Sequence, residues 1–507
     1  MGNSALSKRE KYAKAYFKKI VDERAYKDFD VDFEYENLVL SGGGDRACTY
    51  VGAAKVLDDL GILPKIKRFA GTSMGSVIAA TLAVGASPVD LYAFILEDLD
   101  RTVMDSSSVT KLYNVVTKYG WHSGEAVTKK MREVLNRFTG NPDLTFEQLY
   151  KMRGIELCVV VTNLTSQSVE YWHPKTQPDM SIAVAVRASV SLPFLFQPTQ
   201  VEDIVTGDSI YCVDGGILKN FPLNAYDGWY LSLMPKDSFF HRIGSKDLPL
   251  GEVNPRTLGI KVFSALMEDQ SFSSEIRRFK SKEVTRPDTS YAKLRGPIED
   301  TARHAREVEM DMMQAAIRFI TFLSKFSTVN EEGILTKGFK LALEGLAPTS
   351  DSVDAFNGKD WNLLFGENRT IAEITSDLNS NEDDVISNEE LLNHFSKHGV
   401  LLRRLMINKP ASIHQLRRKI NSLYDFAHSI SDSYYHELQC MSHKEEDEER
   451  TIPIYSDYIS MVGPRMTLKD KEFIVKQGYE ATLAFFEEKA EQIKEKGKEE
   501  VVDVKNI

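Results

Sequence analysis

Two short strings about 140 residues apart contain the residue types needed for nucleophilic hydrolysis. The first, Gly71–Gly75 (GTSMG), fits the G-x-S-x-G pattern of a nucleophile elbow, in which a sharp strand-to-helix turn exposes a serine hydroxyl. The second, Asp214–Gly216 (DGG), offers a carboxylate with small neighbours. A serine hydroxyl is a poor nucleophile until a neighbouring base removes its proton. The pair Ser73 and Asp214 therefore predicts a nucleophilic serine whose base is an aspartate.

A third string, Ser41–Arg46 (SGGGDR), could stabilise the negative charge that forms on an attacked carbonyl oxygen. Such an oxyanion needs at least two N–H donors that converge on one point. Gly42, Gly43 and Gly44 lack a Cβ, so their amides can turn towards that point. Arg46 could add positive charge and attract the phosphate of a lipid head group.

Apolar segments of strand and helix length place these strings in an α/β domain. Strands are expected at 37–40, 66–70, 156–162, 209–213 and 258–263, and helices at 49–60 and 75–84. Strands separated by helices predict a largely parallel sheet with covered faces. The strand that leads into Ser73 is apolar, and so is the helix that follows it, which favours the elbow interpretation.

The order of these motifs resembles that of the patatin-like phospholipases: S-G-G-G-x-R, then G-T-S-M-G, then D-G-G. The segment Ala188–Pro198 (ASVSLPFLFQP) is similar to the family's A-S-x-x-x-P-x-x-F-x-P block. The resemblance implies a three-layer α/β/α catalytic domain at 33–266, with a mainly parallel sheet. It also implies a phospholipase A-type hydrolase that cleaves fatty-acyl esters of phospholipids through an acyl-serine intermediate and requires no cofactor.

The same resemblance implies a role for each site residue. Ser73 would be the nucleophile and Asp214 the base, and the oxyanion loop would consist of Gly42, Gly43, Gly44 and Arg46. The family usually continues G-G-G-x-R-G, whereas this chain has Ala47 at the last position. A methyl group there restricts the loop and puts full activity in question.

The N-terminal residues 1–32 are expected to form a basic amphipathic helix. Residues 8–27 hold eight basic and three acidic side chains, and their apolar residues recur at helical spacing. Such a helix can lie on an anionic membrane. It can also pack on the catalytic domain with a solvated basic face, which is the interpretation we favour.

Helical patterns dominate the C-terminal half of the chain. We expect a helical extension at 267–347, a linker rich in Ser, Asp, Asn and Gly, and a second helical module at 360–507. This half is large enough to bind a partner, so a partner-activated or weakened effector-type scaffold is the alternative function. The resemblance extends to bacterial effector lipases that need a host factor, which implies a protein activator and export into a host cell.

Residues 379–390 resemble an EF-hand calcium loop. Oxygen-bearing side chains stand at ligand positions, and the candidates are Asn379, Asn381, Asp383 and Glu390. Two departures favour a plain helix-connecting loop instead: Asn379 replaces the usual first aspartate, and Asp384 stands where the turn glycine is expected.

Bulk composition excludes several function classes. A net charge of −11 argues against nucleic-acid binding. Four widely separated cysteines give neither a zinc pattern nor a disulfide framework, so a reducing compartment is expected. No apolar run is long enough to cross a bilayer, and the N-terminus is unlike a secretory signal. We therefore expect a cytoplasmic protein that contacts the phospholipid membrane surface peripherally.

Two other interpretations of the motifs compete. A Ser-Asp-His triad would need His241 or His304, but neither stands in a recognisable context. A dinucleotide site would use the G-x-G-x-x-A pattern at 42–47. It lacks the acidic residue that should end the next strand, and it leaves Ser73 and Asp214 unexplained.

Overall fold

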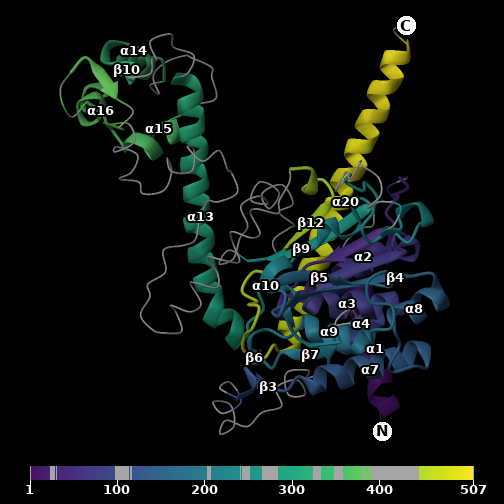
Figure 1. Cartoon of the computed structure of the whole chain (residues 1–507). Coiled ribbons are helices and arrows are strands. Elements are labelled where there is room, and N and C mark those ends of the chain that lie inside the picture. The colour runs from purple at the N-terminus through teal and green to yellow at the C-terminus, as the bar shows by residue number, and fades with distance from the viewer. Residues whose placement is uncertain are drawn as a thin grey trace. The chain divides into compact units, whose positions relative to one another are not determined.

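The chain divides into two compact units, residues 1–297 with 430–507 and residues 298–429. Figure 1 shows a computed structural model of the whole chain. The residues that it describes are 2–22, 29, 31–97, 114, 117–202, 207–239, 241, 252–264, 284–323, 333–346, 358–379, 381, 383–387, 389–390 and 445–505.

The first unit is built on an eight-stranded sheet with the order β12-β9-β1-β2-β4-β8-β7, and β5 pairs with β4 off this path. The strands from β12 to β4 are parallel, whereas β8, β7 and β5 join antiparallel. Their bounds are β1 (Asn37–Leu40), β2 (Arg68–Thr72), β4 (Glu156–Asn163), β5 (Ser168–Trp172), β7 (Thr199–Glu202), β8 (Ser209–Asp214), β9 (Thr257–Phe263) and β12 (Thr451–Tyr455). The predicted α/β fold with a mainly parallel sheet is confirmed.

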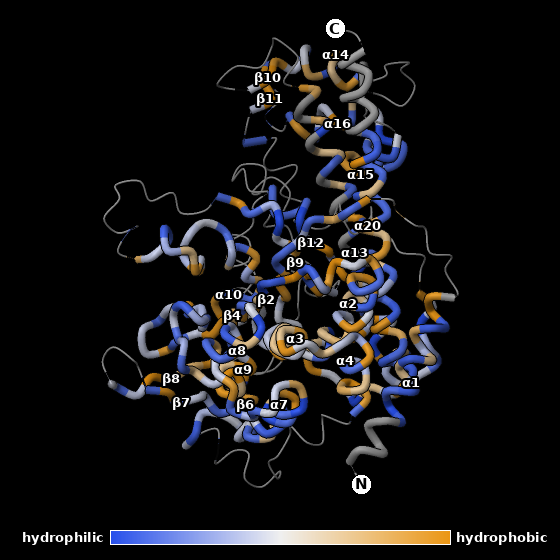
Figure 2. The backbone as a smooth tube through the Cα atoms, turned by 90° about the vertical axis from the view of Figure 1, so that its right-hand side faces the viewer, coloured by the Kyte–Doolittle hydropathy of each residue, from blue (hydrophilic) through white to orange (hydrophobic). Residues whose placement is uncertain are grey.

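The sheet is covered on both faces, because successive side chains of a strand point to opposite sides. From β4, Leu157 and Val159 join the large core under the helices, whereas Cys158 and Val160 join a smaller core with Tyr226. The large layer contains α2 (Thr49–Asp59), α3 (Met74–Ala83), α4 (Pro88–Ile95), α7 (Glu125–Thr139), α8 (Phe146–Arg153), α9 (Ile182–Ser189) and α20 (Leu468–Lys505). The short α10 (Gly216–Lys219) and the 3-10 turn η3 (Leu223–Tyr226) accompany the smaller core. In Figure 2 the central helix α3 carries hydrophobic colour, as expected for a buried helix that follows the predicted elbow serine.

The C-terminal part is organised differently from the predicted module at 360–507. Strand β12 extends the sheet beside β9, and α20 packs along α2. An ideal Cβ on Gly52 would lie 1.9 Å from the Val475 carbonyl oxygen, and one on Gly478 would lie 1.9 Å from the Thr49 carbonyl oxygen. The two helices therefore touch through a reciprocal pair of glycines. Strand β12 escaped prediction because it has five residues, one of them Pro453, and proline is tolerated only at a sheet edge.

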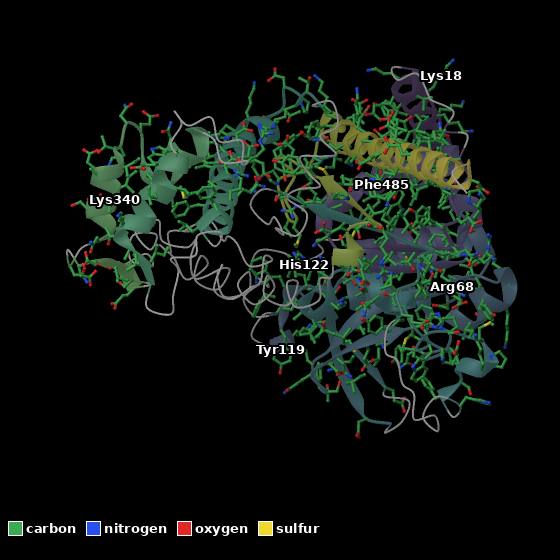
Figure 3. The ribbon with its side chains drawn as sticks, turned by 90° about the horizontal axis from the view of Figure 1, so that it is seen from above. Lys18, Arg68, Tyr119, His122, Lys340 and Phe485 are labelled. Carbon is green, nitrogen blue, oxygen red and sulfur yellow. The ribbon has the colours of Figure 1, made fainter. Side chains whose placement is uncertain are left out.

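The basic N-terminal helix is part of this unit. Helix α1 (Gly2–Asp22) buries Tyr16, Phe17 and Ile20, and the first two rings lie 5.4 and 5.6 Å from the ring of Tyr92 on α4. Lysines on the opposite side are exposed, among them Lys18 (Figure 3). The interpretation that this helix packs on the catalytic domain is confirmed, and its apolar face is not available to a membrane.

The second unit is mainly helical, with α14 (Thr336–Leu346), α15 (Gly358–Phe365), α16 (Ile371–Leu378) and most of α13 (Ser290–Leu323). Strands β10 (Gly333–Leu335) and β11 (Val385–Ser387) pair antiparallel. Aromatic side chains from three helices contribute to its own core, including Phe319, Phe339 and Trp361. Most of the predicted linker at 348–359 lies outside the described residues. Across the helices described in both units, none combines the length and apolar character of a membrane span.

We predict that Gly478→Ala destabilises the first unit by about 2 kcal/mol, because the added methyl group would overlap the backbone of α2. Urea unfolding followed by tryptophan fluorescence should show a lower midpoint. Gly140→Asn is the matched control, since Gly140 faces open space with φ +73°, a conformation that asparagine tolerates. An unchanged midpoint for Gly478→Ala would show that α2 and α20 are not in contact.

Candidate active site

Ser73 lies at the turn between β2 and α3 with φ 53° and ψ −131°. A positive φ is strained for a residue with a side chain, and it is typical of a nucleophile elbow. The flanking glycines are sterically required. An ideal Cβ on Gly71 would lie 2.5 Å from the Gly75 carbonyl, and one on Gly75 would lie 2.4 Å from the Ser41 carbonyl oxygen. The predicted strand-to-helix turn thus holds the Ser73 hydroxyl above the ends of β1 and β2.

Asp214, the last residue of β8, meets Ser73 across the antiparallel junction of the sheet. The Ser73 Oγ donates a hydrogen bond to the Asp214 Oδ2 at 2.6 Å, and the Gly216 amide donates to the Oδ1 at 2.7 Å. Asp214 is only 4% exposed. The structure therefore brings the two predicted residues together, with each carboxylate oxygen accepting one hydrogen bond.

Burial sets the protonation behaviour of this carboxyl group. Desolvation raises the pKa of Asp214 from 3.8 to about 6, against the lowering effect of the hydrogen bonds from Ser73 and Gly216. A carboxylate with this pKa is ionised at neutral pH and is a stronger base than an exposed aspartate. The arrangement can accept the proton of a serine hydroxyl.

Two serines of the Ala188–Pro198 block hold the pair in place. The Ser189 Oγ accepts from the Ser73 amide at 2.8 Å and donates to the Val160 carbonyl at 2.6 Å. The Ser191 carbonyl accepts from the Asp214 amide at 3.0 Å. Neither serine was predicted to belong to the site. The similarity of the Ala188–Pro198 block to the family pattern was the sequence feature that could have pointed to them.

The glycine loop lies against Ser73, since an ideal Cβ on Gly42 would be 3.0 Å from the Ser73 Cβ. The prediction that all three glycine amides face one point is wrong for Gly42, because its N–H donates to the Asn220 carbonyl at 3.0 Å. The Asn220 Nδ2 returns a bond to the Gly42 carbonyl at 3.2 Å, so the pair fixes the loop. Within the described residues, no acceptor bonds the amides of Gly43 and Gly44.

Arg46 does not face a lipid phosphate as predicted. It is 4% exposed, and its Nε donates to the Ile459 carbonyl at 3.2 Å. The Asp45 amide donates to the Met461 carbonyl at 2.9 Å, and a Cβ on Gly44 would lie 2.0 Å from the same oxygen. The segment after β12 therefore supports the glycine loop, which sequence reasoning missed because that segment lies more than 400 residues downstream.

Neither histidine of the alternative triad is bonded to Ser73. The His241 Nδ1 lies 3.3 Å from the Ser238 Oγ, and His304 belongs to the other compact unit. The Asp214 carboxylate is the hydrogen-bond acceptor of the Ser73 hydroxyl in the described structure.

The residues of the predicted calcium loop bond mainly to one another. The Asn381 Nδ2 donates to the Asp383 Oδ2 at 2.8 Å, and the Asn381 amide reaches the Glu390 Oε1 at 3.3 Å. Glu390 also accepts from the Ser387 amide at 3.0 Å, as in a helix-capping box. The Asn379 Oδ1 is buried without a hydrogen-bond partner. Calcium binding stays a prediction, and no cluster of three or more His, Cys, Asp or Glu groups suited to a metal occurs in the described parts of the chain.

Comparison with known proteins places residues 38–226 in the family described as patatin-like phospholipase, so the chain contains a patatin-like domain. An uncharacterized protein of Acanthamoeba polyphaga mimivirus is 32% identical over 195 residues, 38% of this chain and 62% of that protein. A probable lipid hydrolase of Invertebrate iridescent virus 6 is 29% identical over 193 residues, with the same two shares. The aligned region thus spans about three fifths of these relatives' length. VipD from Legionella pneumophila aligns with 90% of this chain and 67% of its own at 14% identity and a TM-score of 0.39.

We predict that Asp214→Asn gains stability relative to the native protein as pH rises. Because the folded-state pKa of Asp214 is raised from 3.8 to about 6, its contribution is fully present below about pH 4 and is lost as pH rises through about 6. The free energy of unfolding of the native protein should therefore fall by about 2–3 kcal/mol between pH 4 and pH 8 because of Asp214. The Asp214→Asn protein lacks this loss.

Urea unfolding of both proteins at the two pH values measures this difference. Asp179→Asn is the matched control, since Asp179 is exposed and its replacement should leave the pH dependence unchanged. A constant stability difference between native protein and Asp214→Asn would contradict the burial effect.

Proposed function

We propose that this protein hydrolyses fatty-acyl esters of phospholipids, with Ser73 as nucleophile and Asp214 as its base. The observation that carries the proposal is the 2.6 Å hydrogen bond from the elbow serine to a buried carboxylate. The patatin-like domain at 38–226 supports an ester hydrolase of lipids in general. The choice of phospholipids over other acyl esters is part of the proposal.

In the first step the Ser73 Oγ attacks the ester carbonyl carbon while its proton moves to the Asp214 Oδ2. The proton follows the existing hydrogen bond, so no side chain has to move. The elbow strain and the bond from the Ser73 amide to Ser189 hold the hydroxyl in this orientation. The new C–O bond converts the carbonyl oxygen into an oxyanion.

The Gly43 and Gly44 amides are the proposed donors to this oxyanion. They lie on a loop that touches Ser73 and is fixed by Asn220 on one side and by Met461 on the other. Donors that are held before the reaction stabilise the charge without reorganisation, and one such donor contributes about 3 kcal/mol. Gly42 and Arg46 act indirectly in this scheme, because their hydrogen bonds keep the loop in shape.

Collapse of the tetrahedral intermediate breaks the ester C–O bond. The leaving alcohol of the lysophospholipid takes the proton from Asp214, and the acyl group stays on Ser73. A water molecule then attacks the acyl-serine and gives a proton to Asp214, which returns it to the Ser73 Oγ as the fatty acid leaves. These steps use only groups of this chain and water.

We predict that Ser73→Ala and Asp214→Asn each lower fatty-acid release from phospholipid vesicles by at least about 1,000-fold. Both substitutions keep the size of the side chain close to the original, so the fold should be retained. Release is measured by titration of free fatty acid, on vesicles and on a panel of other acyl esters.

Matched controls separate this dyad from a triad. Ser166→Ala and His241→Ala should retain the activity, since Ser166 is exposed and His241 is not bonded to Ser73. Full activity of Asp214→Asn would rule out the dyad. Repeating the assay with and without a eukaryotic cell extract tests the expected activation by a host protein; equal rates would indicate a constitutive enzyme.

We further predict that kcat/KM rises with pH through about 6 and is level above it, because only ionised Asp214 accepts the proton. Below this value the rate should fall about tenfold for each pH unit. A soluble short-chain ester is the substrate, so that lipid packing does not vary with pH. His241→Ala should show the same profile, and a flat profile between about pH 5 and 8 would contradict the role of Asp214.

A further inference from the structure

Four exposed aromatic side chains belong to a short two-stranded ribbon and to β8 of the first unit, and we call them the aromatic patch. Strand β3 (Gly120–His122) pairs with β6 (Phe194–Phe196), and this ribbon carries Tyr119, Trp121 and Phe194, which are 62%, 42% and 70% exposed. The fourth is Tyr211 of β8, whose ring centroid lies 6.4 Å from that of Tyr119. Figure 3 labels Tyr119 at the periphery and His122 farther inside.

The backbone is strained at two of the four residues of the aromatic patch. Tyr119 has φ 63° and Phe194 has φ 68°, and a bulky residue in this region is a genuine outlier. Such strain persists only where surrounding structure enforces it, and it concentrates at functional sites. Neither ring gains a buried position in return, so folding alone does not explain these conformations.

A buried arginine connects the aromatic patch to the proposed active site. Arg187 is 5% exposed and donates to the Gln197 carbonyl at 2.8 Å, to the Ser123 carbonyl and to the Ser191 Oγ. Ser191 in turn bonds the Asp214 amide, and Phe194 follows it by three residues. The Phe194 Cα is therefore at most about 11 Å from that of Ser191, at about 3.8 Å per residue.

The two segments that form the ribbon are poor in charged residues, and the exposed carboxylates of Glu125, Glu202 and Asp208 stand just outside them. Residues 117–124 and 188–201 make up 22 positions and contain a single Asp, Glu, Lys or Arg, which is Lys118. These residue types make up 27% of the whole chain, so about six would be expected. A lipid surface accepts such a face because few charges have to be desolvated, and rings of Trp and Tyr favour the boundary between acyl chains and head groups.

We propose that the aromatic patch is the surface by which this protein docks on a phospholipid bilayer. The inference rests on the proposed function and adds the place of contact. Its occupant is a lipid surface and not a protein. The four side chains of the patch are uncharged and stand on or beside a two-stranded ribbon, and Arg187 connects that ribbon to Ser191, which bonds the Asp214 amide. Helix α1 is not the apolar anchor, since its aromatic face packs on Tyr92.

The test measures vesicle binding without turnover. In the Ser73→Ala background, sedimentation with phosphatidylcholine vesicles is compared with the variant that also carries Tyr119→Asn, Trp121→Gln and Phe194→Asn. We expect binding to weaken at least about 100-fold, since burial of one aromatic ring is worth roughly tenfold. Asparagine tolerates positive φ, so the thermal midpoint should stay equal or rise, which excludes misfolding as the cause.

Tyr150→Ser with Met152→Ser is the matched control, because these exposed side chains on α8 (39% and 53%) lie outside the aromatic patch. It should bind vesicles as the Ser73→Ala protein does. Binding should also persist at about 0.5 M salt, where contacts of the α1 lysines would be screened. Unchanged binding of the triple variant, or no binding to vesicles by the parent, would overturn the docking role.

The two proposals fail separately. Patch-dependent binding without fatty-acid release by the native protein would refute the hydrolase and leave the docking surface intact. Release that depends on Ser73 and Asp214, with binding independent of the aromatic patch, would refute the docking surface alone.

Discussion

The hydrogen bond between Ser73 and a buried Asp214 is the interaction on which the rest of this structure depends. Removing a carboxylate from water is unfavourable, and this desolvation is why the pKa of Asp214 is raised. Among the described residues, two hydrogen bonds to its carboxylate compensate for this, one from the Ser73 hydroxyl and one from the Gly216 amide. The fold must therefore hold the two side chains together against their own preference for solvent. It does so by ending β2 and β8 beside the shared neighbour β4, where Val161 pairs with Asp214 and Val160 with Thr72.

Supports for the site come from parts of the chain that are distant in sequence. Ser189 and Ser191 orient the serine and the aspartate through backbone bonds, and Asn220 fixes the glycine loop. The segment after β12 closes the other side of that loop through the Ile459 and Met461 carbonyls. This segment belongs to the same compact unit as residues 1–297, although the family match ends at residue 226. The compact unit that holds the site is thus larger than the patatin-like domain.

Much of this arrangement could be predicted from the sequence. The predictions that were wrong or missing concern features that depend on contacts between residues distant in the sequence. The bounds of the strands and helices near Ser73 were predicted within about two residues, because apolar runs that end at glycines indicate local structure. The pairing of Ser73 with Asp214 was also predicted, since the elbow and the aspartate each have local signatures, and their catalytic roles stay predictions. Gly42 and Arg46 were misassigned because amide and guanidinium directions depend on Asn220 and Ile459, which only the folded chain brings near. Strand β12 was missed because pairing with β9, and not its own composition, makes Pro453 acceptable there.

Three of the six described non-glycine residues with positive φ lie along one connected path. Ser73, Tyr119 and Phe194 have positive φ, and Asp214 is a buried charge. Ser191 and Arg187 link these positions, because one bonds the Asp214 amide and the other binds the ribbon that carries the exposed rings. A sequence selected for stability alone would relieve each of these strains with a small substitution. Their persistence on one hydrogen-bonded path supports both proposals together, in which the ribbon meets a lipid surface and the Ser73–Asp214 pair receives an acyl ester from it.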